Sequence, residues 1–473
     1  MPSSIIRAMA AIFAPDAQGR TRTARRADLL LCGGGALMLL WPALENGYPL
    51  IFSDTGTYIS QVLELHLGWD RPPFYSLLVI VAGLGRSLWP VIIVQALAAA
   101  WLVRAIHRQL APAAGALETG VLLAGLAAGT SLSWTASQVM PDIFTPLMVL
   151  AFAGLVLDPA AKTAGAGHAL AIGAAIVVHL SNMPIYAGLC LAVLPLRCLR
   201  HRVRWRVLLL PFLLGVACLT AVNTLARGSP SPSPYGATFL LARLIENGPA
   251  RATLAADCPR AGWALCAYRD DMPRTADAFL WRADSPLYRA GGPRRLVAQT
   301  DAIVDRTLAA HPRAVLRAAG RDFALQLVTF APGSGLRPWY ATAWQTIRRD
   351  LPRPAYESYV ASRQARGRMV VPPFLAALMR LLAAGGMAAT ALFALFTLFA
   401  VSRRDIGEAA RSLGLLCWIV LLALAGNAAV TGALSGPHAR YQSRVVWLAV
   451  LSGWLVLRQV QAGCRSRPTS STK

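Results

Sequence analysis

Two short polar stretches, near opposite ends of the chain, contain residue types suited to chemistry on an anionic substrate. The first is Ser-Asp-Thr-Gly-Thr-Tyr at residues 53–58, and the second is His-Ala-Arg-Tyr-Gln-Ser-Arg at residues 438–444. A carboxylate such as Asp54 can serve as a general base toward an acceptor hydroxyl. An arginine such as Arg440, with His438 beside it, can bind phosphoryl oxygens through parallel hydrogen bonds. The pairing suits a reaction on a lipid-linked substrate that carries a phosphate.

The first stretch also has a structural interpretation. Asp54 precedes Thr-Gly-Thr-Tyr-Ile-Ser-Gln-Val, a sequence that can begin a helix, so its carboxylate would then be an ordinary N-cap. The residues alone favour neither the base nor the cap. Tyr58 also has two possible roles: its aromatic ring either stacks on a sugar or holds the loop in place.

The second stretch can be interpreted as a membrane anchor. Arginines beside an apolar run bind anionic lipid head groups, and this explains Arg444 well. It explains His438, Arg440 and Tyr441 less well, because positive charge in a short outer loop opposes the charge bias found elsewhere in the chain. We therefore favour a functional role, with His438 and Arg440 on a phosphate and Tyr441 at the substrate.

Further polar residues near the ends of apolar segments complete the candidates. Arg71, in Asp-Arg-Pro-Pro-Phe-Tyr at residues 70–75, either contacts a phosphate or pairs with Asp70 at the surface. His179 lies near the outer end of its apolar segment and could reach the same site, although an interfacial histidine satisfied by its neighbours is the commoner arrangement. Arg380 lies within an apolar segment, where an unpaired charge is costly, so it either snorkels to the interface or binds a donor phosphate.

The composition places these residues in a membrane protein. Hydrophobic residues make up 56% of the 473 positions and charged residues only 14%. A bilayer accepts such a surface, whereas a soluble fold would need an implausibly large core. The net charge of +24 does not indicate nucleic acid binding, because the arginines cluster at the ends of apolar runs and no basic stripe carries interleaved aromatic residues. We expect membrane lipids, and no nucleic acid, as partners.

The apolar runs predict an all-α polytopic protein with about ten transmembrane helices. A hydrocarbon core of about 30 Å needs about 20 apolar residues per helix. Such runs lie near residues 29–46, 88–107, 115–134, 141–158, 167–182, 183–198, 207–226, 374–401, 412–433 and 443–460. Residues 73–87 are apolar but short, and we place them as an interfacial helix on the outer surface. No small-residue cleavage site follows the first run, which favours a retained helix over a cleaved signal.

The distribution of arginine orients these helices. One set of loops carries arginines at positions 20, 22, 25, 26, 104, 108, 197, 200, 202, 204, 206, 403, 404, 411, 465 and 467. The positive-inside rule assigns that side, with both termini, to the cytoplasm. Asp54, Arg71, Asp142 and Arg440 then share the outer face. The localisation that we expect is a bacterial-type inner (plasma) membrane, crossed several times.

The chain divides into three regions. Residues 1–226 form an N-terminal membrane module, whose first outer loop, at about 47–87, holds the candidate base. Residues 227–371 begin with a Ser-Pro linker and then show helical apolar spacing, which predicts a mostly helical periplasmic domain inserted before the last three spans. Residues 372–473 form a C-terminal membrane module of three helices.

The eight cysteines sort by compartment. Most fall in or beside predicted spans, where cysteine behaves as a small apolar residue: Cys32, Cys190, Cys198, Cys218, Cys417 and Cys464. Cys258 and Cys266 alone lie in the outer region, with seven residues between them. In an oxidising periplasm we favour a disulfide between them over two free thiols, and no nearby His or further Cys completes a zinc pattern.

The layout of these motifs resembles the GT-C superfamily of integral membrane glycosyltransferases, which includes protein mannosyltransferases and lipid A aminoarabinose transferases. The resemblance lies in an acidic first outer loop, a Pro-Pro-aromatic segment after Arg71, an acidic second outer loop at Met140-Pro141-Asp142, and Arg440-Tyr441 before the last span. In layout it covers about the first 200 residues and the last 100, through motifs that are short.

The resemblance implies inverting transfer of a sugar from a polyprenyl-phosphate donor at the non-cytoplasmic face. Asp54 would match the catalytic carboxylate of the first loop, Asp142 the second acidic position that in some members joins a metal or acceptor site, and Arg440 a donor-phosphate contact. Two features depart from the pattern. A single Asp, rather than paired acids, stands near position 54, which leaves the use of a divalent cation open. The long domain precedes the last three spans, which leaves the acceptor open among glycan, lipid and protein.

Two other classes of function stay open. One is a transporter or lipid flippase. Ion-coupled transport usually needs ionisable residues within the spans, and these spans contain almost no Asp, Glu or Lys; a neutral scramblase or a structural assembly component passes this test. A polymerase or ligase of lipid-linked glycans would also use outer arginines, but it would not need Asp54 as a base in the same way. Placement of Asp54 and Arg440 on opposite sides of the molecule would exclude the glycosyltransferase interpretation.

Overall fold

The computed structural model describes residues 22–157, 163–197, 203–402 and 407–465, and these residues fold almost entirely into helices. Among them there is no β-strand, and only Leu50 and Gln138 form an isolated bridge. This confirms the predicted all-α class.

The N-terminal region consists of α2 (Arg22–Leu39), α3 (Trp41–Asn46), α4 (Thr55–Leu63), α5 (Phe74–Gly83), α6 (Trp89–Leu110), α7 (Ala116–Gly129), α8 (Leu132–Ala136), the 3-10 helix η1 (Pro141–Ile143), α9 (Phe144–Leu157), α10 (Thr163–Val178), α11 (Asn182–Val193), η2 (Leu194–Arg197) and α12 (Trp205–Arg227). The central region consists of α13 (Gly236–Glu246), α14 (Pro249–Asp257), η3 (Ala264–Asp271), α15 (Ala276–Trp281), α16 (Pro286–Arg289), α17 (Pro293–Ala310), α18 (Pro312–Val328), α19 (Ala343–Asp350) and α20 (Arg353–Ala361). The C-terminal region consists of α21 (Pro373–Ser402), α22 (Glu408–Ser435) and α23 (Ala439–Arg465).

Among the described residues, five helices are long and apolar enough to cross a bilayer: α6, α12, α21, α22 and α23. The other predicted spans coincide with helices that are shorter or less apolar. For example, α7 has 14 residues, which at 1.5 Å per residue reach about 21 Å, less than the roughly 30 Å of a hydrocarbon core. The helices therefore fit a membrane protein with five candidate spans, and the count of ten crossings stays a prediction.

The segment predicted as an interfacial helix, residues 73–87, contains the short helix α5. Its inner side packs into the protein, where the Tyr75 hydroxyl bonds to Gln95 of α6 at 2.6 Å and Ser76 accepts a hydrogen bond from Gln61 at 3.0 Å. Its other side exposes apolar side chains such as Leu77. Ten residues are too few to cross a bilayer. Helix α5 is therefore a short helix with one side buried in the protein and the other side exposed.

Small residues let α23, which begins within the second polar stretch, pack closely on α21. A Cβ atom at Gly386 would lie only 2.7 Å from the backbone oxygen of Ala449. Next to this contact, Thr390 of α21 and Ser452 of α23 share a hydrogen bond of 2.7 Å. Close approach at small residues and hydrogen bonds between helices are typical of helix association in membranes. These contacts help to fix where the first turn of α23 lies.

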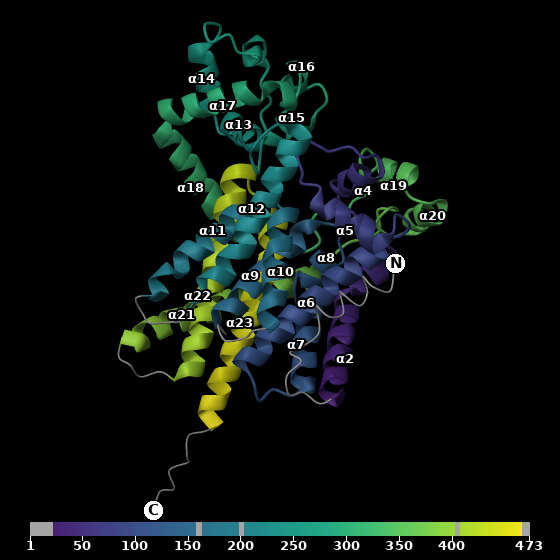
Figure 1. The fold of residues 1–473 in the computed structure, drawn as a ribbon, viewed down its shortest axis with the longest axis vertical. Helices are drawn as coiled ribbons and strands as arrows, with labels where there is room; N and C mark the ends of the chain where they lie inside the picture. The colour runs from purple at the N-terminus through teal and green to yellow at the C-terminus, as the bar shows by residue number, and fades with distance from the viewer. Residues whose placement is uncertain (1–21, 158–162, 198–202, 403–406, 466–473) are drawn as a thin grey trace, which may run out of the picture.

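The central region, predicted as a single domain over residues 227–371, divides between two cores. Helices α13 to α17 surround a core of their own, which includes Leu241 and Phe279, and Figure 1 shows them together at one end of the molecule. Helix α18 leads back from this unit and packs along α22. Helices α19 and α20 instead contribute Ile347 and Tyr359 to the main core. Helix α19 packs on α4, and Tyr359 of α20 lies against Tyr48, at the start of the loop that leads to α4.

The predicted disulfide is present in the α13–α17 unit, where Cys258 and Cys266 are joined with their Cα atoms 5.4 Å apart. The free cysteines that the structure describes lie in helices of the main bundle: Cys32, Cys190, Cys218 and Cys417. Two further cysteines of the sequence, Cys198 and Cys464, lie outside the residues whose side chains are described.

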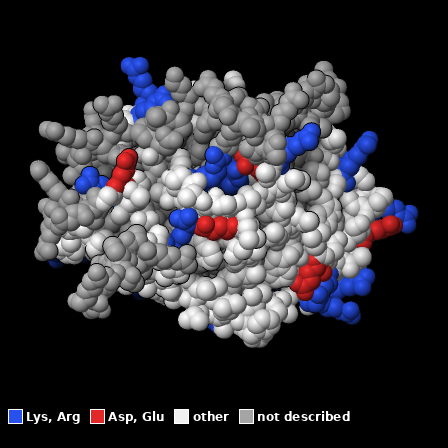
Figure 2. All heavy atoms as spheres, turned by 90° about the horizontal axis from the view of Figure 1, so that it is seen from below, with Lys and Arg blue, Asp and Glu red and all other residues white. Residues whose placement is uncertain are grey.

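The end of the molecule opposite the α13–α17 unit carries paired charges. Figure 2 views this end and shows the visible acidic side chains next to basic ones. Among the ion pairs of α2, α6, α7 and α23, Asp28 contacts Arg104 and Arg108, and Glu118 contacts Arg458. Many arginine side chains assigned to the cytoplasm lie outside the described residues: Arg20, Arg22, Arg25, Arg197, Arg200, Arg202, Arg403, Arg404, Arg465 and Arg467.

Candidate functional site

The two polar stretches meet in the structure. Oδ2 of Asp54 lies 2.6 Å from a guanidinium nitrogen of Arg71 and 3.6 Å from one of Arg440. Nε of Arg440 lies 4.0 Å from Oδ2 of Asp142. These four residues, which we call the Asp54 cluster, come from the first outer loop, the second acidic loop and the first turn of α23. Asp54 and Arg440 therefore do not lie on opposite sides of the molecule.

Backbone hydrogen bonds hold the two acidic loops together. The amide of Leu50 donates to the carbonyl of Ser137, and the amide of Val139 donates to the carbonyl of Leu50, both at 2.9 Å. The hydroxyl of Thr55 also donates to the carbonyl of Val139, at 3.0 Å. These bonds flank Asp54 and lie just before Asp142, so they bring the two carboxylates to the same place.

Asp54 stands at the N-cap position of α4, but its side chain makes no capping hydrogen bond. Its carboxylate faces Arg71 and Arg440 instead, and only 17% of the side chain is exposed. Burial raises the pKa of Asp54, but the positive charges of Arg71 and Arg440 outweigh burial and hold the pKa below its ordinary value. The capping interpretation is therefore wrong, and Asp54 is an ionised carboxylate between two guanidinium groups.

Arg444, interpreted from sequence as a lipid anchor, is the buried partner of Asp142. Nη1 of Arg444 donates to Oδ1 of Asp142 at 3.0 Å, and the two side chains are 1% and 2% exposed. Asn427 accepts two further hydrogen bonds from Arg444, at 3.1 and 2.8 Å, and Ser181 accepts one at 3.1 Å. The anchoring interpretation is wrong, because Arg444 points into the protein, where Asp142 and Asn427 of α22 bind it.

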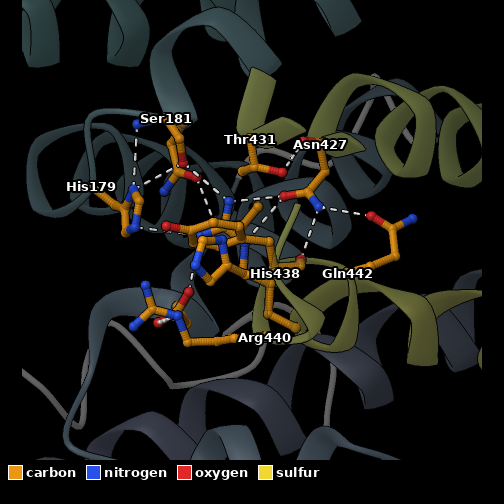
Figure 3. Close-up of polar contacts among 12 residues, drawn as sticks. His179, Ser181, Asn427, Thr431, His438, Arg440 and Gln442 are labelled. Carbon is orange, nitrogen blue, oxygen red and sulfur yellow. Dashed lines mark hydrogen bonds and ion pairs between the residues drawn. The ribbon is translucent and has the colours of Figure 1, made fainter. Parts of the chain in front are cut away.

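His179 lies in the turn between α10 and α11, and Figure 3 shows it with Ser181 on the side of the network opposite Asn427. Its Nε2 atom accepts a hydrogen bond from Nη1 of Arg444 at 3.3 Å. Because a guanidinium group can only donate, this Nε2 atom carries no proton and the ring is neutral. The structure thus brings His179 to the Asp54 cluster as a neutral acceptor that orients Arg444.

Arg440 is held by aromatic rings more than by hydrogen bonds. Its guanidinium carbon lies 4.3 Å from the ring centre of Phe52 and 5.0 Å from that of Tyr441. Its distances of 3.6 and 4.0 Å to Asp54 and Asp142 are those of ion pairs and too long for hydrogen bonds. The Nη1 group is buried and has no hydrogen bond partner in the described structure. Arg440 therefore keeps a donor that a phosphate oxygen can accept from, and Tyr441 helps to hold it.

Tyr58 fills the core under the first loop. Its side chain is 3% exposed and packs edge-on against Tyr75, with the ring centres 4.8 Å apart. Burial raises the pKa of the Tyr58 hydroxyl far above its ordinary value. Of its two predicted roles, holding the loop agrees with this position. Stacking on a sugar needs an exposed ring face, so that prediction is wrong.

The α13–α17 unit contributes two residues that the sequence did not reveal. The ring centre of Trp281, at the end of α15, lies 5.6 Å from the guanidinium carbon of Arg71. Asp277, in the same helix, lies 3.6 Å from Nε2 of His438, and this contact raises the pKa of His438. His438 is thus engaged by a carboxylate, in contrast to its predicted place on a phosphate. No local pattern links α15 to these loops, because the contacts arise only when the unit folds over them.

Arg380 lies apart from the Asp54 cluster. Its side chain is exposed on α21, a candidate membrane-spanning helix. An arginine in this position agrees with the predicted snorkelling of its charge toward lipid head groups. The structure does not bring it to the other residues that were predicted to bind a donor phosphate.

A cavity, which we call the Arg440 cavity, opens beside Arg440 and Asp142. It is partly open to solvent, and Gln138 and Ser443 add polar groups to its wall. Two buried atoms of residues that line it, Oδ2 of Asp142 and Nε1 of Trp134, have no hydrogen bond partner among the described residues. Buried polar atoms without partners are rare in native proteins. The cavity therefore offers unused donors and acceptors to a polar ligand.

The divalent cation left open by the family resemblance finds no ligand set in the described ranges. Within them, no group of three or more His, Cys, Asp or Glu side chains is arranged to hold a metal ion. The two carboxylates of the Asp54 cluster each face arginines instead.

Comparison with known proteins adds no relative. No protein-family model matches the chain, and neither the curated proteins nor the solved structures include a significant match. The likeness to GT-C enzymes rests on the short motifs alone, and the function has to be argued from the charges and cavities of this chain.

Proposed function

We propose that this protein is a membrane glycosyltransferase, which transfers a sugar from a polyprenyl-phosphate donor to an acceptor hydroxyl at the non-cytoplasmic face of the membrane. One observation supports the proposal above all. The Asp54 cluster joins a carboxylate to an arginine with an unused donor, beside a polar cavity and next to apolar helices. Sugar transfer from a phosphate needs these groups, because a base must accept the hydroxyl proton and a cation must stabilise the departing phosphate.

In the proposed reaction, the acceptor oxygen forms a bond to the anomeric carbon of the sugar while the bond from that carbon to the phosphate oxygen breaks. The electron pair of the broken bond leaves with the polyprenyl phosphate, and Arg440 stabilises the negative charge that develops there. Asp54 accepts the proton of the acceptor hydroxyl. Attack from the side opposite the phosphate inverts the configuration of the anomeric carbon.

Binding of the donor would also prepare the base. Without a donor, Arg71 and Arg440 hold the pKa of Asp54 below its ordinary value, and such a carboxylate is a weak base. A phosphate bound to Arg440 would offset the positive charge near Asp54, so the pKa of Asp54 would rise. Asp54 would then be an effective base only when the donor is in place.

The proposal places the protein in a bacterial-type inner membrane with about ten crossings, both termini in the cytoplasm and the α13–α17 unit in the periplasm. Three observations support this orientation. Five helices are suited to crossing a bilayer, the disulfide suits an oxidising compartment, and the arginine-rich loops fall on one predicted side.

Cysteine labelling tests the orientation. In a background that keeps only the disulfide, Asp284→Cys should react with a membrane-impermeant maleimide in cells with a permeable outer envelope, because this position of the α13–α17 unit is exposed. Arg204→Cys should react only after the inner membrane is opened, since the positive-inside rule assigns its loop to the cytoplasm. Reaction of Arg204→Cys in intact inner membranes would refute the ten-span arrangement.

Replacement of Arg440 by lysine tests the donor contact. Lysine keeps the charge but loses the planar fork of the guanidinium group, so one hydrogen bond to the phosphate should be lost. A hydrogen bond to a charged group contributes about 1.5–3 kcal/mol, which corresponds to roughly a 10- to 100-fold lower turnover. The measurement is release of undecaprenyl phosphate from a panel of undecaprenyl-phosphate hexoses and pentoses by the purified protein in detergent.

Arg363→Lys is the matched control for Arg440→Lys. Arg363 pairs with Glu45 at 2.6 Å, and half of its side chain is exposed, so the control variant should keep full turnover. Equal, mild effects at both positions would contradict the donor contact and would favour a transport or structural role.

A further inference from the structure

A second cavity adjoins Arg71, and we call it the Arg227 cavity. Arg71 lines this cavity, whereas Arg440 lines the first one. The carboxylate of Asp54 contacts both arginines, at 2.6 and 3.6 Å. A group bound in the Arg227 cavity would therefore approach Asp54 beside Arg71, and a group bound in the Arg440 cavity would approach it beside Arg440. Such an arrangement suits a reaction in which a donor and an acceptor meet beside one carboxylate.

Arg227, at the end of α12, brings an uncompensated positive charge to this cavity. Its guanidinium group donates to Oδ1 of Asn223 at 2.6 Å and to the carbonyl of Gly68. Its Nε atom is buried without a hydrogen bond partner, and no carboxylate of the described chain forms an ion pair with it. Arg71, in contrast, pairs with both Asp54 and Asp70. A partly buried guanidinium group without a counter-ion is costly, and an anionic ligand would offset that cost.

One wall of the Arg227 cavity is apolar. Leu219 and Val222 of α12 form it together with Leu180 from the turn before α11. Helix α12 is one of the candidate membrane spans. Further along its surface, the side chain of Leu225 is 88% exposed, as expected of a residue that faces lipid. A ligand that satisfies both walls has an anionic group at one end and a hydrocarbon chain at the other.

Aromatic residues at the rim indicate the depth of the cavity in a membrane. Trp69 and Tyr235 line it, with their ring centres 5.9 Å apart. Trp69 also stacks on Trp281 of the α13–α17 unit at 5.8 Å. Tryptophan and tyrosine are enriched at the level of lipid head groups. The cavity therefore lies where the head group of a membrane lipid would meet the Asp54 cluster.

We propose that the Arg227 cavity binds the acceptor and that this acceptor is a phosphate-bearing lipid. Its phosphate would contact Arg227, its hydrocarbon would lie along Leu219 and Val222, and a head-group hydroxyl would face Asp54. The role as acceptor rests on the proposed sugar transfer. Binding of a phosphate-bearing lipid at Arg227 does not.

The test compares three probes: dioctanoyl phosphatidic acid, dioctanoylglycerol and inorganic phosphate. Their binding to the full-length protein is measured by calorimetry in a neutral detergent. Phosphatidic acid should bind at least about 10-fold more tightly than either of the others, because it alone uses both walls. Arg227→Gln should weaken its binding by about 10-fold or more, whereas Arg380→Gln, which changes an exposed arginine on α21, should leave it unchanged.

Two further variants keep the test independent of folding. Arg227→Lys retains the charge and should retain part of the binding. Val222→Gln alters only the apolar wall. It should weaken the binding of phosphatidic acid and leave the binding of inorganic phosphate unchanged. Thermal unfolding of each variant shows that it is folded. Unchanged binding in Arg227→Gln would overturn the proposal, as would equal binding of phosphatidic acid and inorganic phosphate.

Turnover separates this proposal from the proposed function. If Arg440→Lys has no effect on sugar transfer but the binding of phosphatidic acid still depends on Arg227, the glycosyltransferase proposal fails and the proposed lipid site is retained. If Arg440→Lys is impaired and Arg227→Gln transfers sugar normally to every lipid acceptor supplied, the assignment of the acceptor fails alone.

Discussion

Asp54→Asn should lower turnover by about 10²-fold or more, the usual contribution of a general base, because asparagine keeps the size of the side chain but cannot accept the acceptor proton. Binding of undecaprenyl phosphate should be as tight as in the unaltered protein or tighter, since Arg440 loses a counter-ion that lies 3.6 Å away. The measurement is a single-turnover assay of sugar transfer together with calorimetric binding of undecaprenyl phosphate.

Asp284→Asn is the matched control, because Asp284 is an exposed carboxylate that pairs only with Arg282 at the surface, and its turnover should be unchanged. The pH dependence gives a second readout. The acid limb of kcat/KM, which reports the free enzyme, should lie below the ordinary aspartate pKa of 3.8, because the arginines hold the Asp54 pKa low. The acid limb of kcat should lie at higher pH, since a bound phosphate offsets Arg440. Full turnover in Asp54→Asn would reduce Asp54 to a structural partner of Arg71.

Arg444→Met should reduce the free energy of unfolding by about 3–5 kcal/mol, the range for removal of one partner of a buried ion pair. Methionine fills a similar volume, but it leaves the carboxylate of Asp142 charged, buried and without its hydrogen bond of 3.0 Å. Asn427 and Ser181 would also lose the guanidinium group from which they accept hydrogen bonds. The measurement is reversible denaturant unfolding in detergent, followed by tryptophan fluorescence.

The double variant Asp142→Asn/Arg444→Met should recover part of the lost stability, because it removes the uncompensated charge as well. Arg363→Met provides the surface comparison, and removing that exposed pair with Glu45 should change stability by about 0–1 kcal/mol. Similar losses in Arg444→Met and Arg363→Met would show that the burial of the Asp142 pair contributes little.

Local patterns in the sequence were sufficient for the helical class and for the place of the polar loops. An apolar segment in a membrane must satisfy its own backbone hydrogen bonds, and a helix does this within one segment, so a helix lies at each predicted span. Basic residues gather in the loops of one predicted side, and for this reason the few charged residues of the opposite loops, among them Asp54, Arg71 and Arg440, could be selected without a structure. Cys258 and Cys266 could be paired because, among the cysteines, they alone lie in the long polar region between the apolar segments.

Local patterns did not predict the partners of Arg440 and Arg444. These residues are four apart on one helix and therefore share a face, yet the sequence assigned one to a phosphate and the other to lipid head groups. The packing of α23 against α22 and α9 turns Arg444 onto Asp142 and leaves Arg440 at the edge of a cavity. Asp142 and Arg444 are 302 residues apart, and no local periodicity relates them.

The sequence by itself determined that this protein is a bundle of apolar helices with an acidic loop and an arginine-rich turn suited to anionic substrates. Only the tertiary structure decided that Asp54 does not cap its helix, that Tyr58 is buried, that α15 of the central region covers Arg71, and that an arginine without a counter-ion lines a second cavity. The physical reason is that helix formation depends on neighbours a few residues away. The pairing of buried charges depends on how segments hundreds of residues apart pack together.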